Sequence, residues 1–149
     1  MGFTLIELMA AVAIAGILAA LAAPSFSSLI ASQRAKAVAS ELFGSLSRTR
    51  SEAIMRNTAV TLSPKAGSWQ SGWQILDPSN AANVLDDHGS AGGMTINGPA
   101  SVTYRASGRL GAGAAPSFLI TATAGSATAY QCVSVDLSGR PYMVAAPSC

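Results

Sequence analysis

The chain opens with a long apolar segment, and charged residues become frequent only after it. Between Leu8 and Ala23 no side chain is charged or strongly polar, and after Glu7 the next charged residue is Arg34. As a helix, residues 3–23 would rise about 32 Å, which matches a bilayer hydrocarbon core of about 30 Å. The pattern predicts a membrane-spanning helix in which the carboxylate of Glu7 is the one unfavourable group.

Glu7 distinguishes this segment from a purely apolar membrane anchor. A carboxylate in a membrane helix costs about 2.5–3.5 kcal/mol at mid-bilayer and less near the helix end, so its presence indicates a partner for the charge. A secretory signal peptide is the alternative, because the small residues of 19–23 are similar to a cleavage site. That alternative also needs a basic n-region, which Met1 and Gly2 do not provide.

Residues 25–57 predict an amphipathic helix that continues the first one. Apolar side chains recur there at roughly helical spacing, with polar residues between them. They are Phe26, Leu29, Ile30, Val38, Leu42, Leu46 and Ile54. We expect this apolar stripe to pack on the domain that follows, and we expect Pro24 to kink or loosen the helix by removing one backbone donor.

After Asn57 the pattern changes to short apolar or alternating runs between turn-forming residues. The runs predict strands at 59–62, 72–76, 94–96, 101–104, 118–122, 130–135 and 142–145. Turn formers dominate 64–67, 77–82, 88–93, 108–116 and 138–139. We therefore expect an α+β fold, with one long N-terminal helix laid against an antiparallel sheet. Trp73 and Phe118 are expected core anchors, and Gly139 is expected to supply a turn conformation.

Composition agrees with a chain divided between an apolar segment and an ordinary domain. Of 149 residues, 50% are hydrophobic and 11% are charged, and the mean hydropathy is +0.38. This balance excludes a disordered chain and disfavours a cytosolic enzyme. The length after the apolar segment allows one globular domain.

The residues Gly2-Phe3-Thr4-Leu5-Ile6-Glu7, followed by a long apolar helix, closely resemble the class III signal of type IV pilins and type II secretion pseudopilins. The resemblance implies that a prepilin peptidase cuts after Gly2 and methylates the new N-terminus at Phe3. It also implies that Glu7 pairs with the terminal amine of a neighbouring subunit. Leaders of this kind carry basic residues before the glycine, so we expect residues 1–2 to be the remainder of a longer leader.

Further segments are similar to the GspH/FimT family of minor pilins and pseudopilins. They are Arg48-Thr49-Arg50-Ser51-Glu52-Ala53-Ile54, Ala59-Val60-Thr61-Leu62, Gly72-Trp73-Gln74-Ile75, Val102-Thr103-Tyr104, Ser107-Gly108-Arg109 and Val133-Ser134-Val135 with Ser138-Gly139-Arg140. The resemblance implies a single-pass inner-membrane protein with helix 3–24 and a periplasmic domain 25–149. It implies pilin or pseudopilin partners and leaves pilus assembly and type II secretion both open.

Two cysteines, Cys132 and Cys149, follow the apolar segment. If the domain faces the periplasm, as the resemblance implies, these cysteines can form a disulfide. Closing a loop of about 17 residues would then stabilise the fold by roughly 3 kcal/mol.

DNA binding is an alternative role, because some members of the resembled family bind DNA during natural transformation. They use basic residues that include a C-terminal Gly-Arg-x-Arg. The matching stretch here is Gly139-Arg140-Pro141-Tyr142, in which a tyrosine replaces the second arginine. Nine Lys and Arg against six acids after Pro24 give this part a charge of about +3. The candidate phosphate contacts are Arg140, Arg109, Arg105 and Lys65.

Catalytic chemistry has little support. The single histidine, His88, lies in the polar stretch 86–89, which is typical of a solvated turn. No nucleophile elbow or phosphate-binding glycine motif is present, and two distant cysteines with one histidine do not make a zinc site. We expect a structural protein without cofactor or metal, not an enzyme.

Overall fold

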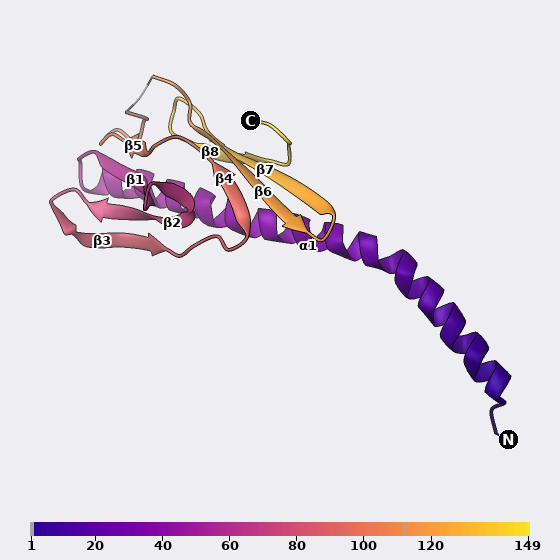
Figure 1. The fold of residues 1–149 in the computed structure, drawn as a ribbon. Coiled ribbons are helices and arrows are strands. Elements are labelled where there is room, and N and C mark those ends of the chain that lie inside the picture. The colour runs from indigo at the N-terminus through magenta and orange to yellow at the C-terminus, as the bar shows by residue number, and fades with distance from the viewer. Residues whose placement is uncertain (1, 112) are drawn as a thin grey trace.

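A computed structural model describes residues 2–111 and 113–149, without the side chains of residues 19–25. One long helix is followed by eight strands that form a head around its C-terminal part (Figure 1). In chain order the elements are α1 (Leu5–Met55), β1 (Val60–Lys65), β2 (Ser68–Asp77), β3 (Asn80–His88), β4 (Met94–Asn97), β5 (Val102–Tyr104), β6 (Ser117–Ala124), β7 (Ala127–Val135) and β8 (Pro141–Val144).

Helix α1 joins the two predicted helical regions into one element of 51 residues, about 77 Å long. It begins at the N-cap Thr4, and Arg56 caps its C-terminal end. The N-terminal part projects from the head as a stalk, and the ribbon curves where it leaves the head (Figure 1). The predicted effect of Pro24 falls on residues whose side chains lie outside those described. No helix in the described part of the chain combines the length and apolarity that a membrane crossing requires.

The strands form two antiparallel sheets of four, in the orders β3-β2-β1-β5 and β4-β6-β7-β8. This confirms the predicted α+β fold, with the strands divided between two sheets. All seven predicted strands overlap observed ones. Helix α1 packs chiefly on β6 and β7 of the second sheet, and the first sheet closes the other side of the core.

Strand β3 is not among the predicted strands, because the predicted turns 77–82 and 88–93 and the polar stretch 86–89 cover most of it. Its first five residues are all exposed, and it pairs only with β2 at the edge of the sheet. An edge strand in contact with solvent on both faces has no alternation of apolar and polar residues to mark it. The prediction of turns at 77–82 and 88–93 was therefore wrong over residues 77, 80–82 and 88, which lie in β2 and β3.

The face of α1 that enters the core differs from the predicted apolar stripe. Val38, Leu42 and Leu46 are buried as expected, whereas Phe26 is 65% and Leu29 is 52% exposed. The rest of the buried face consists of small residues, which are Ala31, Ala35, Ala39, Ser45, Thr49 and Ala53. Small side chains bring the strands close to the helix axis, and Phe26 and Leu29 lie on the opposite side of the helix.

Two predicted core anchors, Trp73 and Phe118, are fully buried, which confirms that prediction. Trp69 packs edge-on against Phe118, with ring centroids 4.8 Å apart, and its indole Nε1 donates to the Pro99 carbonyl at 2.7 Å. The indole Nε1 of Trp73 donates to Ser45 Oγ at 2.9 Å. Both indole donors are thus satisfied inside the core.

Among the described side chains, the hydroxyl of Tyr104 is buried without a hydrogen-bond partner. Burial raises the pKa of Tyr104 to about 12 from its ordinary 10.0, because the phenolate would be poorly solvated. A tyrosine that ionises at lower pH in the unfolded chain removes stability as the pH rises above about 10.

We expect Tyr104→Phe to raise the free energy of unfolding by about 1 kcal/mol, since it removes a buried unsatisfied hydroxyl. We also expect a smaller loss of stability between pH 10 and pH 12 than in the unmodified protein. Urea titrations followed by tryptophan fluorescence at both pH values measure the two effects. Lower stability of the phenylalanine variant at neutral pH would contradict this prediction.

Candidate functional sites

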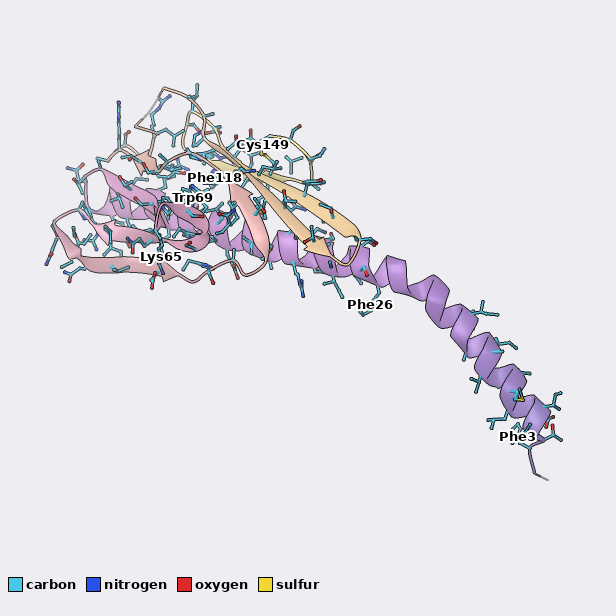
Figure 2. The ribbon with its side chains drawn as sticks, viewed as in Figure 1. Phe3, Phe26, Lys65, Trp69, Phe118 and Cys149 are labelled. Carbon is cyan, nitrogen blue, oxygen red and sulfur yellow. A yellow bond between two sulfur atoms is a disulfide. The ribbon has the colours of Figure 1, made fainter. Side chains whose placement is uncertain are left out.

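The stalk exposes nearly every large apolar side chain that it carries. Exposed fractions run from 59% to 92% over Phe3, Leu5, Ile6, Leu8, Met9, Val12, Ile14, Ile17 and Leu18. Figure 2 shows Phe3 at the free end of the stalk, far from the head, and Phe26 at the point where the stalk approaches it. A contiguous apolar surface of this extent marks a site of contact with lipid or with another protein.

Glu7 lies in the first turn of α1 and forms a capping box with Thr4. Glu7 Oε2 accepts hydrogen bonds from the backbone N and from Oγ1 of Thr4, both at 2.8 Å, and Thr4 Oγ1 accepts from the Glu7 backbone N at 3.3 Å. Gly2 and Phe3 precede the helix and are exposed, so the predicted processing site is open to solvent. The capping box gives Glu7 a local structural role that sequence reasoning missed, although the Thr-x-x-Glu spacing is its signature.

The two cysteines form a disulfide between Cys132 and Cys149, with the Cα atoms 5.5 Å apart. Cys132 lies in the buried part of β7, and Cys149 lies beside β6, where its Sγ is 3.3 Å from the Phe118 carbonyl oxygen. The bond therefore fastens the segment after β8 across the second sheet. It confirms the expected pairing.

We expect the double variant Cys132→Ser with Cys149→Ser to lose about 3 kcal/mol of unfolding free energy, because the bond closes a loop with a sequence separation of 17. Urea titrations of oxidised, reduced and double-variant protein measure the loss. The reduced protein and the variant should coincide. Unchanged stability on reduction would contradict the prediction.

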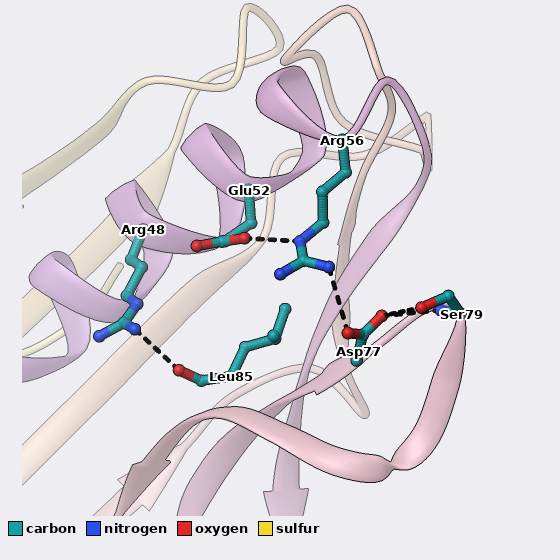
Figure 3. A network of polar contacts seen from close by, with 6 residues as sticks. All are labelled: Arg48, Glu52, Arg56, Asp77, Ser79 and Leu85. Atoms are coloured by element: carbon teal, nitrogen blue, oxygen red, sulfur yellow. Dashed lines mark hydrogen bonds and ion pairs between the residues drawn. The ribbon is translucent and has the colours of Figure 1, made fainter.

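Polar contacts hold the first sheet to α1 (Figure 3). Arg48 donates to the Leu85 carbonyl at 2.8 Å and to Asp86 at 3.1 Å, and Arg56 pairs with Glu52 at 2.7 Å and with Asp77 at 3.1 Å. Hydrogen bonds from Ser79, with help from the charge of Arg56, hold the pKa of the Asp77 carboxyl below its usual range. These exposed pairs fix the orientation of β3 and the β2–β3 turn more than they add stability.

His88 occupies a different environment from the predicted solvated turn. It ends β3, and its ring stacks on the buried ring of Trp73 with centroids 4.2 Å apart and an interplanar angle of 11°. Its Nε2 is 3.2 Å from Glu41 Oε2 on α1. The side chain therefore covers the core and links β3 to the helix. The prediction was wrong because Trp73, which lies opposite His88, belongs to the neighbouring strand β2, and the residues around His88 in the sequence do not indicate this pairing.

Three of the four predicted DNA contacts lie together, and one lies apart. Arg105 and Arg109 flank one turn, and Arg140 ends a second turn that packs against the first. Lys65 lies at the opposite end of β1 from the residue that pairs with Tyr104, about 16 Å along the strand, and it forms an ion pair with Asp87. Figure 2 labels Lys65 on the head.

Sequence reasoning did not select Arg50, which joins the three grouped arginines. Its Nε donates to the Gly108 carbonyl at 3.0 Å, so the guanidinium of a helix residue supports the turn between Arg105 and Arg109. No local motif indicates this contact, because Arg50 and Gly108 are 58 positions apart in the chain.

Comparisons with known proteins agree with this architecture. Residues 38–139 match the family model described as type II transport protein GspH, and residues 2–23 match the prokaryotic N-terminal methylation motif. No curated protein sequence matches the chain significantly.

Two crystal forms of the type IV minor pilin FimU from Pseudomonas aeruginosa have a similar fold. The first is 22% identical, with a TM-score of 0.64, and the match covers 75% of this chain and 89% of FimU. The second is 23% identical, with a TM-score of 0.61 and coverages of 73% and 91%. At this level of identity the similarity concerns the fold.

Proposed function

The chain belongs to the GspH family of type II transport proteins, and on this basis we propose that it is a minor pilin, anchored in the inner membrane by residues 3–24 and built into a type IV pilus. The family consists of structural proteins, not enzymes. Its methylation motif implies a prepilin peptidase and other pilins as partners.

The exposed apolar stalk carries the proposal. An apolar surface on a projecting helix must be covered, first by lipid in the membrane-bound monomer and later by the helices of neighbouring subunits in a filament. One region of the stalk is rich in small residues that permit close helix approach, namely Ala10, Ala11, Ala13, Ala15 and Gly16. The globular part, residues 25–149, would then lie in the periplasm.

Glu7 gives the assembled stalk its register in this proposal. A carboxylate surrounded by apolar helices is tolerated when a cation from another chain neutralises it. The amine created by cleavage after Gly2 is such a cation, and it belongs to Phe3 of a neighbouring subunit. The capping box with Thr4 holds the Glu7 side chain near the helix terminus where that amine would arrive.

N-terminal sequencing and localisation of the mature protein test the proposal. A methylated Phe3 at the N-terminus, together with the protein in sheared and purified pili, supports it. A mature N-terminus after residues 19–23 would identify an ordinary secretory signal peptide instead. Loss of protein export with intact pili in a deletion strain would indicate the type II secretion alternative.

DNA uptake, the other role raised by the sequence, is not part of the proposal. Lys65 is engaged with Asp87, and Tyr142 occupies the position of the second arginine in the DNA-binding pattern. Fewer available cations lower both the affinity for a polyanion and its salt dependence.

A further inference from the structure

Two five-residue turns at one end of the head have the same geometry. Residues 105–109 read Arg-Ala-Ser-Gly-Arg, and residues 136–140 read Asp-Leu-Ser-Gly-Arg. In each, the backbone N–H of the first residue donates to the carbonyl of the fifth, at 2.8 and 3.0 Å, and the glycine N–H donates back to the first carbonyl, at 2.8 and 2.9 Å. The glycines have φ of +72° at Gly108 and +86° at Gly139, a region that favours glycine.

The two turns are packed glycine against glycine. A Cβ at Gly139 would clash with the Gly108 carbonyl oxygen and lie 3.2 Å from the Tyr104 ring, and a Cβ at Gly108 would lie 2.7 Å from Ile54. Arg109 and Arg140 directly follow these glycines, so their backbones leave from adjacent points, and both residues are exposed. Arg105 begins the first turn, and Arg50 Nε donates to the Gly108 carbonyl in that turn. We call Arg50, Arg105, Arg109 and Arg140 the paired-turn cluster.

The charges of the head are unevenly distributed around this cluster. Every acidic side chain in the described part of the head already has a polar partner within the chain. The pairs are Glu41 with His88, Glu52 and Asp77 with Arg56, Asp86 with Arg48, Asp87 with Lys65, and Asp136 with Ser138 and the Arg140 backbone. Six described cations form no ion pair, and four of them are the paired-turn cluster. The cluster therefore carries net positive charge, with the Asp136 carboxylate beside Arg140 as a partial counter-charge.

An apolar pocket adjoins the cluster. Its volume is about 190 Å³, and Pro99, Val102, Leu110 and Pro116 contribute to its lining. Leu110, which lines the pocket, directly follows Arg109, and Arg105 Nη2 donates to the carbonyl of Gly111, the next residue along the chain, at 3.0 Å. Strand β5, which supplies Val102, lies at the end of the head farthest from the N-terminus (Figure 1).

We propose that the paired-turn cluster and its pocket form the docking surface for an acidic segment of a different pilin subunit, with one apolar side chain of that segment inserted in the pocket. The inference rests on the proposed function and names the chemistry of the neighbour. Charge complementarity selects carboxylates, and the pocket selects a protein over a phosphodiester backbone. A second copy of this chain is a poor occupant, because its described acids are already engaged.

Asp136 adds one acidic group to the paired-turn cluster. Hydrogen bonds from Ser138 and from the Arg140 backbone hold the pKa of its carboxyl below the usual range, so its negative charge persists beside Arg140. This one carboxylate offsets only one of the four arginines, so the surface stays net positive and still favours an acidic partner. Mixed polar rims around an apolar centre are typical of protein interfaces.

A binding assay on the full chain in non-ionic detergent tests the proposal by fluorescence anisotropy at low and moderate salt. The probes are a short peptide with one leucine flanked by glutamates, the same peptide with serine for leucine, and a short DNA duplex. We expect the leucine peptide to bind best. We expect Arg109→Glu with Arg140→Glu to weaken it at least tenfold, and Arg109→Lys with Arg140→Lys to retain most of the binding.

The matched control is Arg34→Glu with Lys36→Glu, which changes the net charge equally at two exposed cations on α1. This control should change binding by less than twofold. Equal losses in both double variants, tighter binding of DNA, or no peptide binding at low salt would overturn the proposal. The assay needs no filament, so its failure leaves assembly through Glu7 untouched, and a failure of assembly through Glu7 leaves a positive binding result intact.

Discussion

Replacing Glu7 by glutamine is expected to leave the protein in the membrane fraction and to exclude it from filaments. Glutamine removes the negative charge while retaining most of the side-chain volume. The N-terminal amine of the neighbouring subunit would then be buried without its counter-charge, at a cost of about 3–5 kcal/mol. Since each 1.4 kcal/mol corresponds to a factor of ten, incorporation should fall by about 100-fold or more. Quantitative immunoblots of membranes and of sheared pili measure both fractions.

A comparison of two substitutions separates charge pairing from helix capping at Glu7. Glutamine can replace glutamate in a capping box, whereas alanine cannot, so only Glu7→Ala removes the contacts with Thr4. Both variants should fail to enter filaments if the charge is essential. Normal incorporation of Glu7→Gln together with loss of Glu7→Ala would assign Glu7 a capping role and contradict the pairing proposal.

Gly139→Ala is expected to destabilise the head by about 2–5 kcal/mol. The new Cβ would meet the backbone carbonyl of Gly108, which cannot move without displacing the neighbouring turn, and the φ of +86° is strained for alanine. The paired turns should lose their packing before the rest of the head, so the solvent exposure of Tyr104 should rise. Urea titration followed by the fluorescence of the core tryptophans measures the loss of stability.

Gly67→Ala provides the matched control for this substitution. Gly67 has a similar φ of +71°, but nothing lies within 4 Å of its Cβ position, so alanine there meets only the backbone strain, at about 1–2 kcal/mol. The difference between the two variants reports the packing of one turn on the other. Equal losses would show that the glycine contact between the turns contributes nothing.

The local patterns predicted the fold correctly where the apolar or polar character of a segment by itself indicates its surroundings. The stalk is apolar on all sides, and the central strands β6 and β7 carry buried apolar residues such as Phe118 and Val133. The predictions failed where the environment comes from another element. Strand β3 is exposed at an edge, and His88 is defined by Trp73 and Glu41, neither of which is its neighbour in sequence.

The candidate sites divide in the same way. Gly2, Phe3 and Glu7 belong to one continuous motif of six residues, whose spacing needs no tertiary structure. The basic residues do not form such a motif. Arg109 and Arg140 follow two glycines whose turns pack together, and Arg50 donates to Gly108 from α1. Lys65 lies at the other end of β1 and pairs with Asp87.

The sequence by itself determined that this protein has an apolar stalk with one carboxylate near its start and a separate α+β head, because hydrophobic periodicity and local backbone preferences act over a few residues. Only the tertiary structure decided which of the described Lys and Arg side chains form no ion pair. Every ion pair between elements depends on contacts across 21 to 47 positions, and the paired-turn cluster depends on a glycine-to-glycine contact across 31. Packing at such separations creates a charged surface that no window of the sequence contains.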